Sequence, residues 1–153
     1  MKFVLFYHSL ISDWNHGNAH FLRGICAELI ARGHAVDAYE PNDAWSVRNL
    51  VEERGEHELA RFEAVYPMLR SHCYDPHTLK LDDVLEGADL VLVHEWNDHP
   101  LVERIGEHRR SNGTYRLLFH DTHHRSVTDP RSMAAYRLEH YDGVLAFGEV
   151  VRD

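Results

Sequence analysis

The sequence has few basic residues, few cysteines and no long apolar run. Its 16 lysines and arginines are outnumbered by 25 aspartates and glutamates, which gives a formal net charge of −9. Nucleic acids and anionic membrane surfaces attract basic faces, so this balance disfavours both as partners. No apolar stretch approaches the roughly 20 residues of a membrane-spanning helix, and the first residues do not resemble a signal peptide. The two cysteines, Cys26 and Cys73, are typical of free thiols in a cytoplasmic protein.

The motifs of several common enzyme sites are also missing. A dinucleotide site would require G-x-G-x-x-G after the first strand, but Gly17 stands in the predicted loop, Gly24 lies within the predicted helix and position 19 is not glycine. Only Glu40 stands where such a site would have its ribose-binding acid. The P-loop pattern G-x-x-x-x-G-K-[ST] and the nucleophile elbow G-x-S-x-G do not occur. These absences argue against a nicotinamide or flavin cofactor, a P-loop nucleotide site and a serine hydrolase.

Apolar and polar residues alternate along the chain in the manner of strands and helices. Residues 2–8 form an almost continuous apolar run, typical of a strand that is covered on both faces. A helix is predicted from Phe21 to Ala31, and Gly33 is suited to the left-handed position after its end. A second strand follows at Ala35 to Glu40. Strand, helix and strand with short joins predict a right-handed parallel βαβ unit.

The same alternation continues to the end of the 153 residues, a length suited to one domain. It predicts an α/β fold: a Rossmann-like, doubly wound, mainly parallel six-stranded sheet with helices on both faces. With strand order 3-2-1-4-5-6, a ligand crevice opens beside strands 1 and 4. The remaining predicted elements are helices from Pro41-Asn42-Asp43 to Gly55, Glu58 to Tyr66, Leu81 to Leu85, Pro100 to Arg110 and from Asp129-Pro130, a weak strand within 70–76, and strands Asp89–His94, Tyr115–Phe119 and Val144–Phe147.

Unusual polar residues and many of the 14 histidines gather in the loops after strands 1, 4 and 5. In a parallel sheet these loops share one edge, so we expect one binding site there. Trp14 and Trp96 offer apolar faces for pyranose rings, and a histidine paired with a carboxylate could remove a proton from a hydroxyl. The candidate binding residues are Trp14, Asn15, Gly17, Asn18, His94, Glu95, Trp96, Asn97, His120, His123, His124 and Arg125.

Two other interpretations of these residues stay open. His120, Asp121, His123 and His124, with His94, Glu95 and His16, contain the ligand types of zinc or iron. Their spacing fits no standard metal motif, so we predict no metal site and keep a small metal-dependent hydrolase as a less favoured alternative. The histidines could also simply bond backbone groups at strand ends, and Trp96 could be a packing residue.

Four phrases resemble the N-terminal half of a GT-B glycosyltransferase, and most closely the spore-maturation CgeB-like group. They are the turn His16-Gly17-Asn18-Ala19-His20, the helix end from Leu29 to Val36, the strand from Ala88 to Trp96, and the run from Tyr141 to Phe147. The resemblance spans nearly the whole chain. Its motifs are of middling specificity, because R-G-H-x-V is widespread among glycosyltransferases.

The resemblance implies two Rossmann-like domains facing each other across a cleft. The N-terminal one binds the acceptor, a sugar or another hydroxyl compound, and the C-terminal one holds the nucleotide-sugar, which is a substrate rather than a cofactor. In an inverting enzyme, His16 would be the catalytic base and Asp121 its orienting partner. In a retaining enzyme, His16 would only contact the sugar or phosphate.

The donor-binding half expected from this resemblance would lie beyond Asp153. We therefore expect the chain to be inactive alone, and to act with a missing C-terminal domain or a partner subunit. An apolar patch exposed at the domain junction would favour a homodimer. A stand-alone, non-catalytic module that binds carbohydrate or nucleotide is the alternative from a different functional class.

Overall fold

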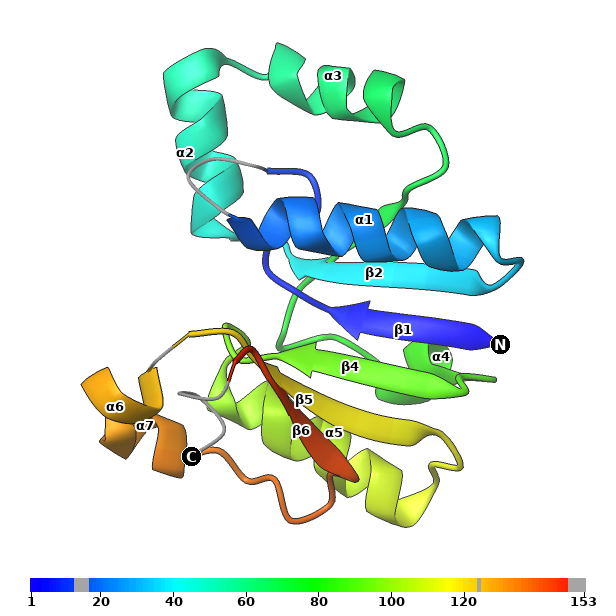
Figure 1. Ribbon diagram of the computed structural model, residues 1–153, viewed down its shortest axis with the longest axis vertical. Helices are drawn as coiled ribbons and strands as arrows, with labels where there is room; N and C mark the ends of the chain where they lie inside the picture. The colour runs from blue at the N-terminus through cyan, green and yellow to red at the C-terminus, as the bar shows by residue number, and fades with distance from the viewer. Residues whose placement is uncertain (13–16, 124, 149–153) are drawn as a thin grey trace.

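The computed structural model describes residues 1–12, 17–123 and 125–148, without the side chains of Asn18 and Ser126 (Figure 1). Its centre is a six-stranded, all-parallel sheet with the order β3-β2-β1-β4-β5-β6. Both the predicted fold class and the predicted strand order are confirmed. The strands are β1 Lys2–Phe6, β2 Ala35–Pro41, β3 Ser71–Tyr74, β4 Leu90–His94, β5 Arg116–Asp121 and β6 Gly143–Ala146.

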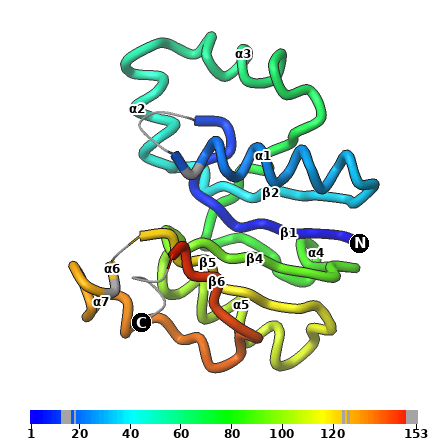
Figure 2. The backbone as a smooth tube through the Cα atoms, viewed as in Figure 1, coloured from blue at the N-terminus to red at the C-terminus, as the bar shows by residue number. Residues whose placement is uncertain are grey.

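Helices cover both faces of the sheet. They are α1 Gly17–Ala31, α2 Trp45–Arg54, α3 His57–Val65, α4 Leu81–Leu85, α5 His99–Ser111, α6 Arg125–Thr128 and α7 Pro130–Ala134. On one face Leu22 and Cys26 of α1 pack with Leu5 and Leu92, and on the other α4 and α5 cover the rest of the core. In Figure 2, α2 and α3 lie at one end of the long axis, and α6 and α7 lie toward the other.

Local sequence signals explain how several helices begin and end. Gly33 has φ +81° after α1, its N–H donates to Ile30 O at 2.9 Å, and His34 N–H donates to Leu29 O at 3.1 Å. This is a Schellman motif, which confirms the predicted role of the glycine. Asp98 and Asp129 cap α5 and α7 by accepting backbone N–H groups through their side chains. None of the helices in the described ranges is long and apolar enough to cross a membrane.

Three predicted boundaries near the expected site were wrong. Helix α1 begins at Gly17 rather than Phe21, so Gly17 lies in its first turn and not in a loop. Strand β1 ends at Phe6, before the predicted residue 8. Strand β5 continues through Asp121, because its polar side chains find partners inside the protein instead of requiring solvent. The short helix α6 was not predicted, since four residues carry almost no periodic signal.

The register places the carboxyl ends of three strands side by side. Phe6 of β1 pairs with Val93 of β4, and His94 of β4 pairs with His120 of β5. The residues that follow these positions therefore emerge at one edge, where the strand order reverses between β1 and β4. In open α/β sheets this is where ligands bind.

Candidate functional site

A layer of buried rings lies beneath this edge. The Tyr7 hydroxyl and His120 Nδ1 are joined by a buried hydrogen bond of 2.6 Å, and the ring of His94 lies 4.8 Å from that of Tyr7. Burial raises the pKa of Tyr7, so the phenol keeps its proton, and burial lowers the pKa of His120. His120 is therefore neutral at pH 7, and the bond joins a neutral phenol to a neutral imidazole.

His94 is a structural link between the ends of β4 and β5. It is fully buried, its Nδ1 accepts the Trp96 N–H at 3.3 Å, and its Nε2 faces Thr122 Oγ1 at 3.0 Å. Because Nδ1 accepts, Nε2 is the nitrogen that donates to the threonine hydroxyl. The ring thus holds the loop after β5 against β4 and does not face the crevice.

His123 and Glu95 form a histidine–carboxylate pair. His123 Nδ1 lies 2.7 Å from Glu95 Oε1, and the same oxygen accepts the Thr122 N–H at 2.9 Å. The Glu95 side chain is 0% exposed, whereas that of His123 is 35% exposed. With Nδ1 donating to the buried carboxylate, the lone pair of His123 is on Nε2. A rigid carboxylate that fixes the tautomer of a partly exposed imidazole is the arrangement of a general base.

Asp121 forms a second pair with the same glutamate. Its side chain is buried, and burial, with the nearby charge of Glu95 and a hydrogen bond between the two side chains, raises the pKa of Asp121. Glu95 Oε2 accepts no hydrogen bond from a nitrogen or hydroxyl of the described residues. The contact with Glu95 favours the protonated form of Asp121, because two carboxylates so close together repel each other. Asp121 therefore contacts Glu95, while its predicted partner His16 lies outside the described residues.

Arg125 and Trp96 close this side of the site. The Arg125 guanidinium lies 5.1 Å from the centre of the Trp96 ring and 3.8 Å from Glu95 Oε2. The Trp96 ring also meets His123 edge-on, with 5.3 Å between ring centres. Trp96 is therefore held in place by contacts with Arg125 and with the candidate base His123.

A pocket of about 390 Å³ lies beside Trp96, at the carboxyl ends of β2, β1 and β4. Trp45 and Trp96 flank it and are 37% and 38% exposed. The His8 ring lies 6.1 Å from that of Trp45 and 5.7 Å from that of Trp96. Tyr74, Asp43 and Asp98 also line the pocket. Two exposed indoles around a polar pocket suit a hydroxylated ring with apolar faces.

Asn97 lines the same pocket, but its amide serves the fold. Its Nδ2 donates to the carbonyl oxygens of Phe6 and His94, both at 2.8 Å, and its Oδ1 accepts from the Tyr74 hydroxyl at 3.1 Å. The side chain is buried, at 5% exposure. It joins the ends of β1, β3 and β4 and so sets the shape of the crevice.

The structure brings together about half of the residues that the sequence predicts for the site. Glu95, Trp96, His120, Asp121, His123 and Arg125 meet at the edge, and His94 and Asn97 support it from below. Gly17 is exposed in the first turn of α1. Trp14, Asn15, His16, His124 and the side chain of Asn18 lie outside the described residues.

The sequence analysis missed His8, Asp43, Trp45 and Tyr74. Asp43 and Trp45 follow the predicted second strand, whose carboxyl end lies at the same edge as those of strands 1, 4 and 5. That placement was the available signal, since the loop after every strand of a parallel sheet opens at this edge. Tyr74 and His8 each end or follow a strand in the same way.

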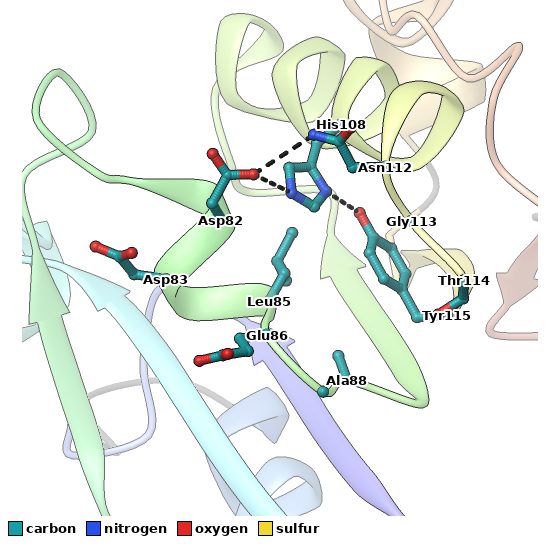
Figure 3. A pocket seen from close by; sticks show the side chains of 11 residues that line it. Asp82, Asp83, Leu85, Glu86, Ala88, His108, Asn112, Gly113, Thr114 and Tyr115 are labelled. Atoms are coloured by element: carbon teal, nitrogen blue, oxygen red, sulfur yellow. Dashed lines mark hydrogen bonds and ion pairs between the residues drawn. The ribbon is translucent and has the colours of Figure 1, made fainter.

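A second pocket, of about 370 Å³, lies at the opposite edge, near the amino ends of β4 and β5 (Figure 3). There His108 Nδ1 lies 2.9 Å from the Tyr115 hydroxyl and its Nε2 lies 3.2 Å from Asp82 Oδ1. These bonds join α4 to α5 and to the start of β5. The position is opposite to where ligands of such sheets bind, so we regard this pocket as a feature of helix packing.

No metal centre is formed by the described residues: no three histidine, cysteine, aspartate or glutamate side chains among them are placed to hold an ion. The rings of His94 and His120 instead make hydrogen bonds to Thr122 and Tyr7. The less favoured hydrolase therefore gains no support from this part of the chain.

Comparisons with protein-family models, with curated proteins and with solved structures find no significant match to this chain. These comparisons therefore identify no family for the chain.

Proposed function

We propose that this chain is the acceptor-side domain of a glycosyltransferase that uses a nucleotide-activated sugar. One observation carries the proposal: an oriented histidine–carboxylate pair, His123 and Glu95, lies against a tryptophan that flanks a ring-sized pocket at the switch point of the sheet. The fold is compatible with this role, and the resemblance favours it.

The chemistry follows from the two parts of the site. An acceptor ring in the pocket would stack on Trp96 and direct a hydroxyl toward His123, whose ring centre is 5.3 Å from that of the tryptophan. His123 Nε2 takes the hydroxyl proton as the oxygen attacks the anomeric carbon of the donor. The bond from that carbon to the leaving phosphate oxygen breaks, and a nucleoside diphosphate departs with its electron pair. Glu95 stabilises the imidazolium that forms.

The donor is assigned to another domain or subunit. Glu95 and Asp121 lie at the ends of β4 and β5, and Asp43 and Asp98 line the neighbouring pocket. Such an acidic edge disfavours a diphosphate, which requires cations or free N–H groups. We therefore expect the nucleotide to bind opposite this edge, on a C-terminal domain or a partner chain.

The test is sugar transfer by the intact protein, measured as nucleoside diphosphate released from a panel of nucleotide-sugars with sugar acceptors. His123→Asn should lower the rate about 10²- to 10⁴-fold, the usual contribution of a general base, and Glu95→Gln should lower it less. His57, which faces Glu58 at 3.6 Å on the exposed surface, provides the matched control His57→Asn with an unchanged rate. Absence of release with every donor would refute the proposal, and a full rate in His123→Asn would refute the base.

A non-catalytic carbohydrate-binding module is the second candidate. It is favoured by the two exposed indoles, Trp45 and Trp96, that flank the pocket at the ends of β2 and β4. This candidate predicts saturable sugar binding without turnover, and binding that His123→Asn does not change.

A further inference from the structure

Two carboxylates, those of Asp43 and Asp98, line the pocket between Trp45 and Trp96. Tyr74 is buried there at 7% exposure, and its hydroxyl is engaged with Asn97. Burial raises the pKa of Tyr74, and the charges of Asp98 and Asp43 raise it further. Both carboxylates therefore act on the bottom of the pocket, and any group that enters meets their field.

The one arginine of the lining does not neutralise this field. Arg48 is exposed on α2 and, among the described residues, forms no ion pair with Asp43 or Asp98. Asp98 Oδ1 accepts the Leu101 N–H at 3.2 Å, which leaves its second oxygen for a ligand. The charged groups that line the pocket are thus two carboxylates and one exposed guanidinium.

Aromatic rings add to the preference for positive charge. Trp45, Trp96 and Tyr74 present three π systems to the same space. The face of an indole attracts a cation, and rings combined with carboxylates are a common way to recognise ammonium groups. A phosphate would be repelled by this lining, and a neutral sugar would use the indole faces but not the field.

We propose that the pocket binds a hydroxylated ring that carries a protonated amine, that is, an amino sugar. The indoles would stack on the apolar face of the ring, and Asp43 and Asp98 would accept hydrogen bonds from its ammonium group. This deepens the proposed function by naming the class of acceptor. Only the role of the amino sugar as an acceptor rests on the proposed function. The binding preference itself can be tested without any transfer.

The test compares two sugars that differ in one group, D-glucosamine and D-glucose, with N-acetyl-D-glucosamine as a second neutral ligand. Each is titrated into the isotope-labelled protein, and amide and indole N–H shifts are followed by NMR at neutral pH. We expect glucosamine to bind at least about tenfold tighter than glucose, which corresponds to ~1.4 kcal/mol. The indole signals of Trp45 and Trp96 should be among those that move.

Variants separate charge from shape. Asp43→Asn should reduce the preference for glucosamine over glucose to a fewfold at most. Asp83→Asn removes one carboxylate from the pocket at the opposite edge and is the matched control, with the preference intact. Trp45→Ala should weaken the binding of both sugars.

Three results would overturn the inference: equal binding of the charged and neutral sugars, a preference that survives Asp43→Asn, or no saturable shift with either sugar. Its failure differs from that of the proposed function. Transfer to a neutral acceptor with no preference for an amine would refute only the ligand class. Selective binding of the amine without any release of nucleotide would refute only the transferase.

Discussion

Asn97→Ala should destabilise the protein far more than an ordinary asparagine substitution. The Asn97 amide makes three hydrogen bonds, to the carbonyls of Phe6 and His94 and with the Tyr74 hydroxyl, at 2.8, 2.8 and 3.1 Å. Its side chain is 5% exposed, so water cannot replace these bonds without a rearrangement of the crevice. The substitution removes a side chain that joins the ends of these three strands.

The magnitude follows from the number of bonds. Each buried hydrogen bond contributes about 1 kcal/mol net, and each partner left buried without a bond costs about 1–3 kcal/mol. In the variant, the carbonyl oxygens of Phe6 and His94 can accept hydrogen bonds from other donors. The Tyr74 hydroxyl has fewer alternative partners, because the residue is only 7% exposed. We therefore expect a loss of about 3–5 kcal/mol in the free energy of unfolding.

Urea denaturation followed by circular dichroism measures this loss. Asn42→Ala is the control, because Asn42 is exposed and its backbone N–H, which donates to Tyr74 O at 2.8 Å, remains in the variant. That change should stay within about ±0.5 kcal/mol. Asn97→Asp keeps the volume but removes both donors, so it should also destabilise strongly. A loss below about 1 kcal/mol for Asn97→Ala would refute the assigned role of the amide.

Further predictions concern charge, thiols and one turn. Because the pKa of Asp121 is raised in the folded chain, the folded chain keeps a proton there that the unfolded chain loses above about pH 4. The contribution of this proton to stability is full below that pH and is lost as pH rises through the folded pKa. Asp121→Asn, which mimics the protonated acid, should stabilise the protein at pH 7 and not at pH 3.5 in urea titrations; equal effects at both pH values would contradict this. Burial raises the pKa of Cys26 to about 12, whereas Cys73 is exposed, so a thiol reagent should label only Cys73 in the native protein and both cysteines in urea, as mass spectrometry will show. Gly33→Ala should cost about 1–2 kcal/mol in urea melts because φ there is +81°, and an unchanged midpoint would contradict it.

Much of the fold could be predicted because its signals are local. The apolar runs at 2–6 and 90–94 are strands by composition, and Gly33 ends a helix by its backbone freedom. Boundaries failed where tertiary contacts decide them. His120 and Asp121 continue β5 because Tyr7 and Glu95 lie beside them, and no pattern within residues 115–121 contains that information.

The sequence predicts at which edge of the sheet the site lies, but not which side chains pair with each other there. Sequence spacing places the loops after β1, β4 and β5 together, which is why Glu95, Trp96 and His123 were among the predicted residues. It cannot decide which imidazole meets which carboxylate, because that depends on side-chain rotamers and on differences of a few ångströms. The structure pairs His123 with Glu95 at 2.7 Å, whereas the resemblance implied a base at His16, outside the described residues.

Three of the described histidines at this edge are distinguished by their partners. His94 and His120 are buried, and the Nδ1 atom of each is hydrogen-bonded inside the protein, to the Trp96 N–H and the Tyr7 hydroxyl respectively. Neither Nδ1 atom is therefore available to a substrate. His123 alone among these three donates through Nδ1 to a buried carboxylate and keeps Nε2 as its basic atom on a side chain that is 35% exposed. Two of these three rings thus hold the strand ends together, and the third is the one that we propose as the base.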